Sequence, residues 1–409
     1  MPRRRVPWAA FLSAALLLAW LAATPPIHDL ERDTHVVGAS LRLSPAFLLL
    51  APLCDSMDAL SLLSVTQSVA LVVGAITLYA LWRAARRAPR SAGSELRAGV
   101  RLLGVIVAFY GAAALAPRPM AALALDDPDA LAVDFHSHTN ASHDGRPDFT
   151  ASRNVAWHRA AGFNASYITD HASFDGVAAA ERENPRRAAD GVVSLSGLEL
   201  IYRDEHINVL GLSESDQRFL TLPAPAPAPS PPSSLLGAVV LLQTIPEDLS
   251  RVPVADRAGR RGVQAIELSD GAPRGIAQAQ RDHDLILRIA DSLDLSVVAG
   301  SNNHGWGRTA VAWSVMTLPG WRALSPRELG AAIQHRMTVA RRRAVRVIGR
   351  RTPDPRGSGI ALALTLPAVI WSVLTTMSPA ERLSWIAWAW VLWMAPRLRV
   401  RRAARPFAA

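Results

Sequence analysis

Long apolar runs near both ends of the chain, uncharged except for Arg101 at the edge of one, constrain its fold more than any other sequence feature. A membrane-spanning helix needs about 20 consecutive, mostly apolar residues. The runs that reach or approach this length are Trp8–Thr24, Leu60–Trp82, Val100–Ala116, Ile360–Met377 and Leu383–Met394. Buried core helices of a soluble protein are a poorer explanation, because arginine clusters flank these runs. We therefore expect an N-terminal membrane region at residues 1–118, with spans at 8–24, 60–82 and 100–116, a C-terminal membrane hairpin at 357–397, and a basic tail at 398–409.

The arginine clusters beside these runs give conflicting predictions of orientation. Arginine concentrates on the cytoplasmic side of membrane proteins. The cluster at 83–90 places residues after Pro117 outside, whereas the clusters at 341–351 and 397–402 place the middle of the chain inside. The first run also fits a cleaved signal peptide, because it follows Arg3–Arg5. We expect a multi-pass protein of a bacterial cytoplasmic membrane, and both orientations of the middle domain stay open.

Composition narrows the chemistry that the chain can perform. It has 44 basic and 34 acidic residues, a net charge of +10, and no lysine. Without lysine it cannot carry a Walker A phosphate loop or a Schiff base. Its single cysteine, Cys54, excludes an intrachain disulfide and a cysteine-rich zinc site, so any metal must be held by nitrogen and oxygen ligands. The positive charge fits the head groups of an anionic lipid bilayer better than nucleic acid, although a nucleic-acid substrate stays open.

The residues between the membrane regions alternate between strand-like and helical patterns. After a linker at 119–131, we expect one domain at 132–349. Its strands are predicted at 131–135, 165–169, 192–200, 206–212, 235–244, 263–268, 295–299 and 337–340. Its helices are predicted at 152–161, 174–187, 275–293 and 327–335. This alternation favours an α/β fold with a parallel sheet, and the proline-rich segment 223–232 is expected to be a surface loop.

Histidines and carboxylates follow several of the predicted strands. His136 and His138 are alternate residues of one strand, so both imidazoles point to the same face, as two ligands of one ion require. The loop that follows contains His143 and Asp144. The other candidates at strand ends are Asp170, His171, Glu199, His206, Asn302 and His304. Because the carboxyl ends of the strands converge in a barrel of parallel strands, these side chains can meet in one site.

The order of these motifs resembles the polymerase and histidinol phosphatase (PHP) domain family. The resemblance rests on DFHSHTNASHDG at 134–145, ITDH at 168–171, GLE at 197–199, the strand that begins at His206, and GSNNH at 300–304. It covers just over half of the chain and does not include the membrane runs. It implies a distorted, TIM-like β/α barrel of seven strands, two or three divalent ions, and hydrolysis of phosphate esters.

The resemblance also implies three ion positions. The first ion would be held by His136, His138 and Glu199. The second ion would be held by His143, His171 and His304. Glu199 would bridge from the first ion towards His206 and a third ion.

Other residues have roles that depend on these ions. Asp144 is an alternative to His143, because the chain has one residue more than the family's SDG motif at this point. Asp134 and Asp170 are expected to orient imidazoles through hydrogen bonds. The residues expected to matter most for catalysis are His171, Asp170 and His304.

Two departures from the family pattern weaken the implied site. Asn302 stands where the family has a ligand aspartate, and its amide oxygen brings no negative charge. Ile245 stands where the family has a histidine, and isoleucine cannot be a ligand. We therefore expect one or two well-held ions. Imidazole and carboxylate ligands suit Zn, Mn or Fe better than Mg alone.

The predicted function is hydrolysis of a phosphate monoester or diester, with divalent ions that polarise the phosphoryl oxygens and activate a water molecule. The substrate class is a phosphorylated small molecule, lipid or nucleotide. The arginines considered for gripping phosphate are Arg257, Arg260, Arg261, Arg274 and Arg308. The two departures favour an alternative function, in which a weakened PHP domain binds a metal or phosphorylated ligand as a sensor or scaffold at the membrane.

Overall fold

The structure is a computed structural model, which describes residues 7–86, 91–171, 173–202, 205–212, 240–243, 263–353 and 359–403. Its strands are β1 (Ile27–Asp29), β2 (Thr34–His35), β3 (Ala39–Arg42), β4 (Ala122–Leu125), β5 (Ala130–Ser137), β6 (Ala165–Ile168), β7 (Val193–Tyr202), β8 (Glu205–Leu210), β9 (Val240–Gln243), β10 (Val263–Asp270), β11 (Ser296–Gly300), β12 (Ala312–Thr317) and β13 (Arg346–Arg350). Its helices are α1 (Trp8–Trp20), α2 (Pro45–Leu49), α3 (Ala51–Ser61), α4 (Val65–Ala85), α5 (Ala92–Leu115), α6 (Ala151–Ala161), α7 (Asp175–Glu181), α9 (Pro273–Leu293), α10 (Pro326–Ala340), α11 (Gly359–Ala363), α12 (Thr365–Thr376) and α13 (Pro379–Ala403).

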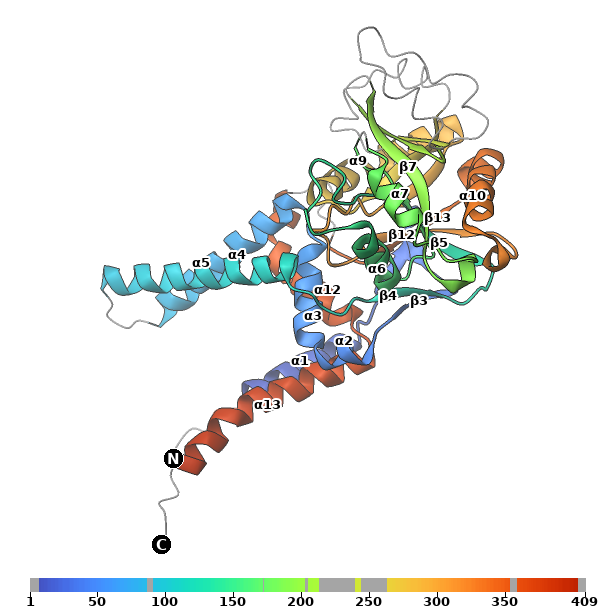
Figure 1. Ribbon diagram of the computed structural model, residues 1–409. Helices are drawn as coiled ribbons and strands as arrows, with labels where there is room; N and C mark the ends of the chain where they lie inside the picture. The colour runs from blue at the N-terminus through green and yellow to red at the C-terminus, as the bar shows by residue number, and fades with distance from the viewer. Residues whose placement is uncertain are drawn as a thin grey trace.

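One large sheet dominates the described part of the chain (Figure 1). Its strand order is β11-β10-β9-β8-β7-β6-β5-β12-β13-β1-β2. Parallel pairing joins β5 to β6, β6 to β7, β9 to β10 and β10 to β11, whereas the other pairs are antiparallel. Helices α6, α7, α9 and α10 come between the strands along the chain. This arrangement confirms the predicted α/β class, with a mixed sheet.

The strands from β5 to β11 form a run whose two ends come together. The backbone N–H of Asn302, just after β11, donates to the carbonyl oxygen of His136 at 2.7 Å. Ser137 and Asn303 form an isolated parallel bridge. The carboxyl ends of β5 and β11 therefore lie side by side, which brings together two motifs that are far apart in the sequence.

Strand β5 carries both a core segment and a site segment. Its residues Leu131, Val133 and Phe135 lie in a buried cluster with Leu329 and Ile333 of α10. All eight residues of the strand are buried. Its register against β6 shifts near the carboxyl end, and beyond this shift the strand contributes polar side chains. The apolar part of β5 thus fixes the position from which the site residues project.

Several predicted elements are confirmed and one is wrong. The helices predicted at 152–161 and 275–293 correspond to α6 and α9, and Gly162 ends α6 with a left-handed φ of 87°. The strand predicted at 337–340 is instead the last turn of α10. Met337 lies one helical turn after Ile333 and enters the same buried cluster, so tertiary packing favours the helix there. The segment 223–232 and Ile245 lie outside the described residues.

The sheet domain includes more of the chain than the predicted range 132–349. Strand β1 pairs with β13 and β2, and β4, inside the predicted linker 119–131, pairs with β3. Ile27, Leu123 and Trp313 share one buried cluster. The predicted boundaries therefore cut through a packed unit. Strands β1 to β4 have only two to four residues each, which is too short for a readable period.

Two helices in the described part of the chain are long and apolar enough to cross a membrane, by length and composition. They lie within α4 and α5, which project from the sheet as a hairpin (Figure 1). Helices α1 and α12 are apolar but shorter. The predicted C-terminal hairpin takes another form: the run at 360–377 is divided between α11 and α12, and α13 lies alongside α1 (Figure 1).

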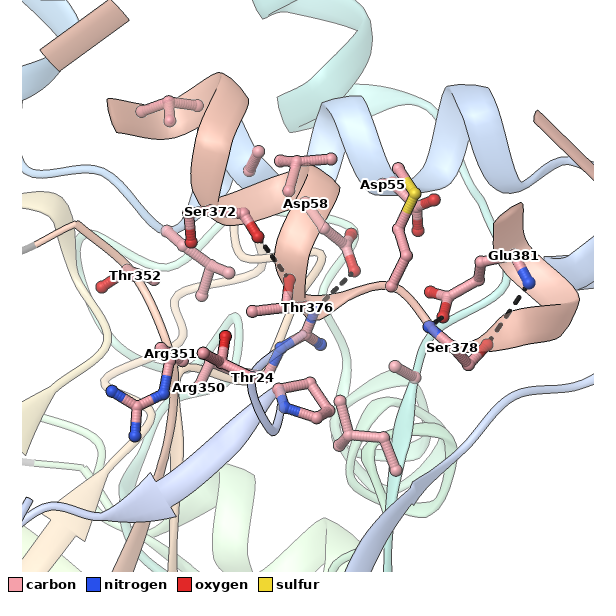
Figure 2. Close-up of a pocket in the computed structure, with 18 of the residues that line it drawn as sticks. Thr24, Asp55, Asp58, Arg350, Arg351, Thr352, Ser372, Thr376, Ser378 and Glu381 are labelled. Carbon is pink, nitrogen blue, oxygen red and sulfur yellow. Dashed lines mark hydrogen bonds and ion pairs between the residues drawn. The ribbon is translucent and has the colours of Figure 1, made fainter. Parts of the chain in front are cut away.

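A pocket of about 200 Å³, lined by both apolar and charged residues, lies where α3, α12 and α13 meet the end of β13 (Figure 2). Asp58 of α3 lines this pocket and accepts hydrogen bonds from Arg118 Nε at 3.1 Å and Thr309 Oγ1 at 2.6 Å. Its second oxygen lies 3.7 Å from Arg350 Nη2, the contact drawn in Figure 2. Asp58 and Arg118 are both buried, so this network ties the helices to the sheet domain.

Candidate metal centre

His136 and His138 face one another at the carboxyl end of β5. Their Nε2 atoms are 3.0 Å apart, and both side chains are buried. The Oε2 atom of Glu199, on β7, lies 3.1 Å from His136 Nε2 and 3.2 Å from His138 Nε2. These three side chains can offer ligand atoms that all lie within 4.8 Å of one another. The structure thus brings together the three residues of the first predicted ion position.

The hydrogen bonds of His136 indicate which nitrogen carries a proton. Its Nδ1 atom lies 3.1 Å from Oε1 of Glu267 on β10. An ionised carboxylate can only accept, so we assign the proton to Nδ1. In the neutral imidazole the Nε2 lone pair then faces the Glu199 oxygen and His138 Nε2. These acceptors repel one another unless a proton or a metal ion lies between them.

The charges around this pair favour a cation. Burial lowers the pKa of His136, but the carboxylates of Glu199 and Glu267 outweigh it and raise that pKa well above its usual value. Burial raises the pKa of Glu199, but His136 and the hydrogen bonds from the histidines bring it below its usual value. Burial lowers the pKa of His138 to about 3, so that imidazole is neutral and offers a lone pair. A metal ion can replace the proton that such groups compete for.

His138 also belongs to a second group, with His171 and His304. Nitrogen atoms of these three imidazoles lie within 4.8 Å of one another. The ring centroids of His138 and His304 are 3.9 Å apart, and those of His138 and His171 are 5.0 Å apart. Burial lowers the pKa of His171 and of His304, which favours neutral imidazoles. His138 therefore lies beside both histidines of the second predicted position, because β5 ends between the loops that carry them.

The loop after β5 presents Asp144 to these histidines more directly than His143. Asp144 Oδ2 lies 3.1 Å from His304 Nε2 and 3.6 Å from His171 Nε2. Ser142 Oγ donates to the other oxygen of Asp144 at 2.7 Å, which positions the carboxylate. His143 and Asp144 are both exposed, the His143 ring centroid lies 5.0 Å from that of His171, and His143, Asp144 and His171 can offer ligand atoms within 4.8 Å of one another. Of the two alternatives, the geometry favours Asp144 as the residue that faces the histidine pair.

Glu199 connects the first group to a third group at the outer edge of the site. Its Oε1 atom lies 2.5 Å from His206 Nδ1, and its Oε2 atom lies 3.6 Å from His171 Nε2. The His206 side chain is 45% exposed, whereas that of Glu199 is 4% exposed. Glu199 thus lies at the centre of the cluster, and His206 lies at its opening to solvent.

Asp134 bonds an imidazole as predicted, but it is that of His158, whereas Asp170 mainly contacts Thr139. Asp170 accepts from the backbone N–H of Thr139 at 2.6 Å and from its hydroxyl at 2.7 Å, and its Oδ1 is 4.0 Å from His138 Nδ1. Asp134 Oδ2 lies 2.7 Å from His158 Nε2, and its Oδ1 accepts from the loop after β11. Both carboxylates hold loops in place, because backbone N–H groups at the ends of strands need acceptors.

Glu267 is a site residue that the sequence motifs do not single out. It is fully buried on β10, where its Oε1 accepts from His136 Nδ1. Burial raises the pKa of Glu267 to about 7, partly offset by His136. The signal in the sequence was a carboxylate between Ile266 and Leu268 in a strand, because such a charge is rarely buried without a partner.

The side-chain amide of Asn302 makes a hydrogen bond to Asp270, a contact that shapes the loop. Its Nδ2 donates to Asp270 Oδ2 at 3.0 Å, and its own Oδ1 is buried with no hydrogen-bond partner among the described residues. The backbone at Asn302 is left-handed, with φ of 43°. The amide oxygen is thus available, but the contact to Asp270 shows that this residue also shapes the loop.

The arginines proposed for phosphate differ in position. Arg257, Arg260 and Arg261 lie outside the described residues. Arg274 is exposed at the start of α9, and Arg308 Nε donates to the carbonyl of Ala114 at the end of α5. A different arginine adjoins the site: the backbone N–H of Arg146 donates to the carbonyl of His304 at 2.9 Å. The Arg146 guanidinium lies 5.4 Å from the centre of the Trp306 ring.

No family model matches this chain, and no curated protein sequence matches it significantly. Among solved structures, PsfC from Pseudomonas syringae PB-5123 is similar at 18% identity and a TM-score of 0.37, over 60% of this chain and 98% of PsfC. A two-domain protein from Bacteroides vulgatus ATCC 8482, which contains a predicted PHP-like metal-dependent phosphoesterase, is similar at 13% identity and a TM-score of 0.37, over 54% of this chain and 65% of that protein. An amidohydrolase from Chromobacterium violaceum with bound sulfate is similar at 15% identity and a TM-score of 0.32, over 49% of this chain and 96% of that protein.

Proposed function

We propose that this chain is a metal-dependent phosphoesterase of the PHP type, tethered to a membrane by the α4–α5 hairpin. The observation that carries the proposal is the approach of His136 Nε2, His138 Nε2 and Glu199 Oε2 to within 3.0–3.2 Å of one another. Because Glu267 accepts the Nδ1 proton of His136, the Nε2 atom of that ring can act as a ligand. A divalent cation satisfies all three at once.

The spacing of these atoms fits metal coordination. Four-coordinate zinc with bonds of about 2.0–2.1 Å holds its ligand atoms roughly 3.3 Å apart. The observed separations are 3.0 to 3.2 Å. The second group adds His171 and His304, with Asp144 as a carboxylate partner, so a second ion has nitrogen and oxygen donors as well. Such donors suit Zn, Mn or Fe.

The distribution of exposure gives the site a closed end and an open end. The His136 and His138 side chains are at most 2% exposed, whereas those of Asp144 and His206 are 44% and 45% exposed. A phosphate ester would enter between the two exposed residues, and the backbone N–H of Arg146 donates to the carbonyl of His304 in this part of the site. Bound divalent ions supply Lewis acidity and activate water near neutral pH. The histidines would hold the ions. The contact between Asp170 and Thr139 fixes the loop that follows His138.

Two further features support the family and the tether. The run from β5 to β11 has seven strands, and its ends are hydrogen bonded to one another, as in a distorted barrel. The hairpin helices have the length and composition of membrane spans and are only 6% buried over their most apolar windows. A core helix of a soluble protein would be mostly covered.

The function is tested with the full chain purified in detergent, because β1 and β2 complete the sheet and a fragment that begins at Ala132 would lack them. We expect hydrolysis of p-nitrophenyl phosphate or bis(p-nitrophenyl) phosphate in the presence of Mn, Zn or Fe. His171→Ala should lose this activity, whereas His335→Ala, an exposed histidine on α10, should retain it. An active His171→Ala protein would contradict the assignment. Bound metal without turnover of either substrate would instead support a binding or sensor domain.

A further inference from the structure

The α4–α5 hairpin has the dimensions of a bilayer crossing. Helix α4 has 21 residues and α5 has 24 residues. At about 1.5 Å per residue these helices are roughly 32 and 36 Å long, against a hydrocarbon core of about 30 Å. Their exposed surface is apolar along most of this length, and it includes Val69, Val73, Leu78, Leu103 and Val107. A lipid bilayer is therefore the partner that fits this surface.

The end of the hairpin that lies away from the sheet has the composition of a membrane interface. The Arg86 guanidinium lies 4.0 Å from the centre of the Trp82 ring, and Arg83 pairs with Glu95 across the two helices at 2.6 Å. Tyr79 packs beside Trp82, with ring centroids 5.7 Å apart. Tryptophan and tyrosine concentrate at membrane interfaces, and arginine concentrates in cytoplasmic loops. In the sequence, Arg87 and Arg90 follow Arg86 and precede α5.

A second pair of helices carries arginine at the same kind of position. Helices α1 and α13 lie side by side, and the first residue of α1 and the last residue of α13 are both at the end away from the sheet (Figure 1). The last part of α13 contains Arg397, Arg399, Arg401 and Arg402, and Arg3–Arg5 precede α1 in the sequence. In both helix pairs, the arginines are therefore at the end that lies away from the sheet domain.

The competing cluster at 341–351 belongs to the folded sheet domain and not to a helix end. Arg342 contacts both Glu31 and Asp291, at 2.5 Å and 2.7 Å. Arg346 pairs with Asp29 at 2.9 Å. Arginines within a folded domain do not set the orientation of neighbouring spans, because large domains are translocated largely regardless of their charge. The conflict between the clusters is thereby removed.

We propose that the end of the hairpin formed by the carboxyl end of α4 and the amino end of α5 faces the cytoplasm, and that the sheet domain, with its histidine cluster, lies on the opposite side of the membrane. This orientation rests on the membrane tether of the proposed function. It places the site in contact with phosphate esters outside the cytoplasm. The substrate is then an extracytoplasmic phosphate ester, such as an exported or lipid-linked one, and not a cytoplasmic nucleotide pool.

The orientation is tested by labelling single cysteines with a membrane-impermeant maleimide. The only native cysteine, Cys54, is fully buried, so the wild-type chain provides the background. Ala85→Cys lies at the end of the hairpin and Ser292→Cys lies on α9, and both positions are exposed. In intact spheroplasts we expect labelling of Ser292→Cys and none of Ala85→Cys until the cells are lysed. The reverse pattern would overturn the orientation alone.

A fractionation control separates failure of the orientation from failure of the tether. If the wild-type chain is released into the supernatant by an alkaline carbonate wash, the membrane tether and the orientation are both overturned, whereas the metal-dependent activity is not. If it stays in the membrane pellet, the labelling pattern decides the orientation. In the variant R83Q/R86Q/R87Q/R90Q, Ala85→Cys should lose its protection in spheroplasts. The matched variant R182Q/R186Q/R187Q/R288Q removes four exposed arginines from the sheet domain and should leave that protection intact. Equal protection in both variants would contradict the role of the hairpin arginines.

Discussion

The Nε2 atoms of His136 and His138 lie 3.0 Å apart, so at most one of these two atoms can carry a hydrogen. Glu199 approaches the same point from β7. Two strands, β5 and β7, thus direct three acceptor atoms at one position, and Glu267 holds the proton of His136 on the far side of its ring. This arrangement is costly unless a proton or a metal ion lies between these atoms, which makes metal binding the property to test.

Glu267→Gln should weaken metal binding although Glu267 is not a proposed ligand. The substitution keeps an oxygen that can accept from His136 but removes the negative charge that makes this imidazole a stronger donor to a metal. Loss of such an outer carboxylate typically lowers metal affinity by about 10–100-fold. Competition with a chromogenic chelator measures the change. Asp284→Asn, an exposed position on α9, is the control, and equal affinities of the two variants would contradict the role of Glu267.

Asp144→Ala should reduce turnover and metal content more than His143→Ala. Both residues are exposed, but the Asp144 carboxylate contacts both His171 and His304, whereas the His143 ring lies near His171 alone. Metal analysis and initial rates of the two purified variants make the comparison. A larger loss for His143→Ala would show that counting along the motif identifies the ligand better than this geometry does.

Gly300→Ala should disturb the site through packing. A Cβ atom at this position would lie 2.1 Å from Glu267 Oε1 and 2.4 Å from His136 Cβ, both of which belong to the proposed centre. Overpacking of this kind costs about 1–3 kcal/mol. We expect a lower melting temperature and weaker metal binding. Gly191→Ala is the matched control, because its added Cβ would be 3.6 Å from the nearest atom, at ordinary contact distance. A Gly300→Ala protein that matches this control would contradict the tight packing.

Asp55 should make the protein less stable as the pH rises. Burial, with the Glu381 charge as the next cause, raises the pKa of Asp55 from 3.8 to about 8. The folded chain therefore keeps a proton that the unfolded chain releases, so the stabilisation is complete at low pH and is lost as the pH approaches 8. Asp55→Asn should flatten the fall of melting temperature with pH, whereas Asp190→Asn, at an exposed position, should not. Parallel profiles for wild type and Asp55→Asn would contradict this prediction.

The strand-end histidines could be predicted from the sequence because they follow apolar runs that end abruptly in polar motifs. His136, His138 and Glu199 meet as expected, since each lies at or near the carboxyl end of a strand in one connected run. The place of His138 in the second group could not be predicted, because it depends on β5 lying between the loops that carry His171 and His304. Spacing along the chain contains no information about that neighbourhood.

The sheet domain was harder to delimit than the site. Strand β1 pairs with β13, more than 300 residues later in the sequence, and its three residues show no period of their own. Pairing with a distant partner, and not local propensity, determines that such a short segment is a strand. The last turn of α10 was mistaken for a strand for the same reason: Met337 is apolar in either structure, and only its contacts in the core decide.

Metal analysis of the full chain tests the central claim most directly. The protein is purified in detergent without chelators, and its Zn, Mn and Fe contents are measured by mass spectrometry beside those of His138→Ala, which removes the imidazole shared by both groups. We predict at least about one divalent ion per wild-type chain and loss of most of it in the variant. A folded wild-type protein that contains no such ion, and takes none up when Zn, Mn or Fe is added, would contradict the proposed centre.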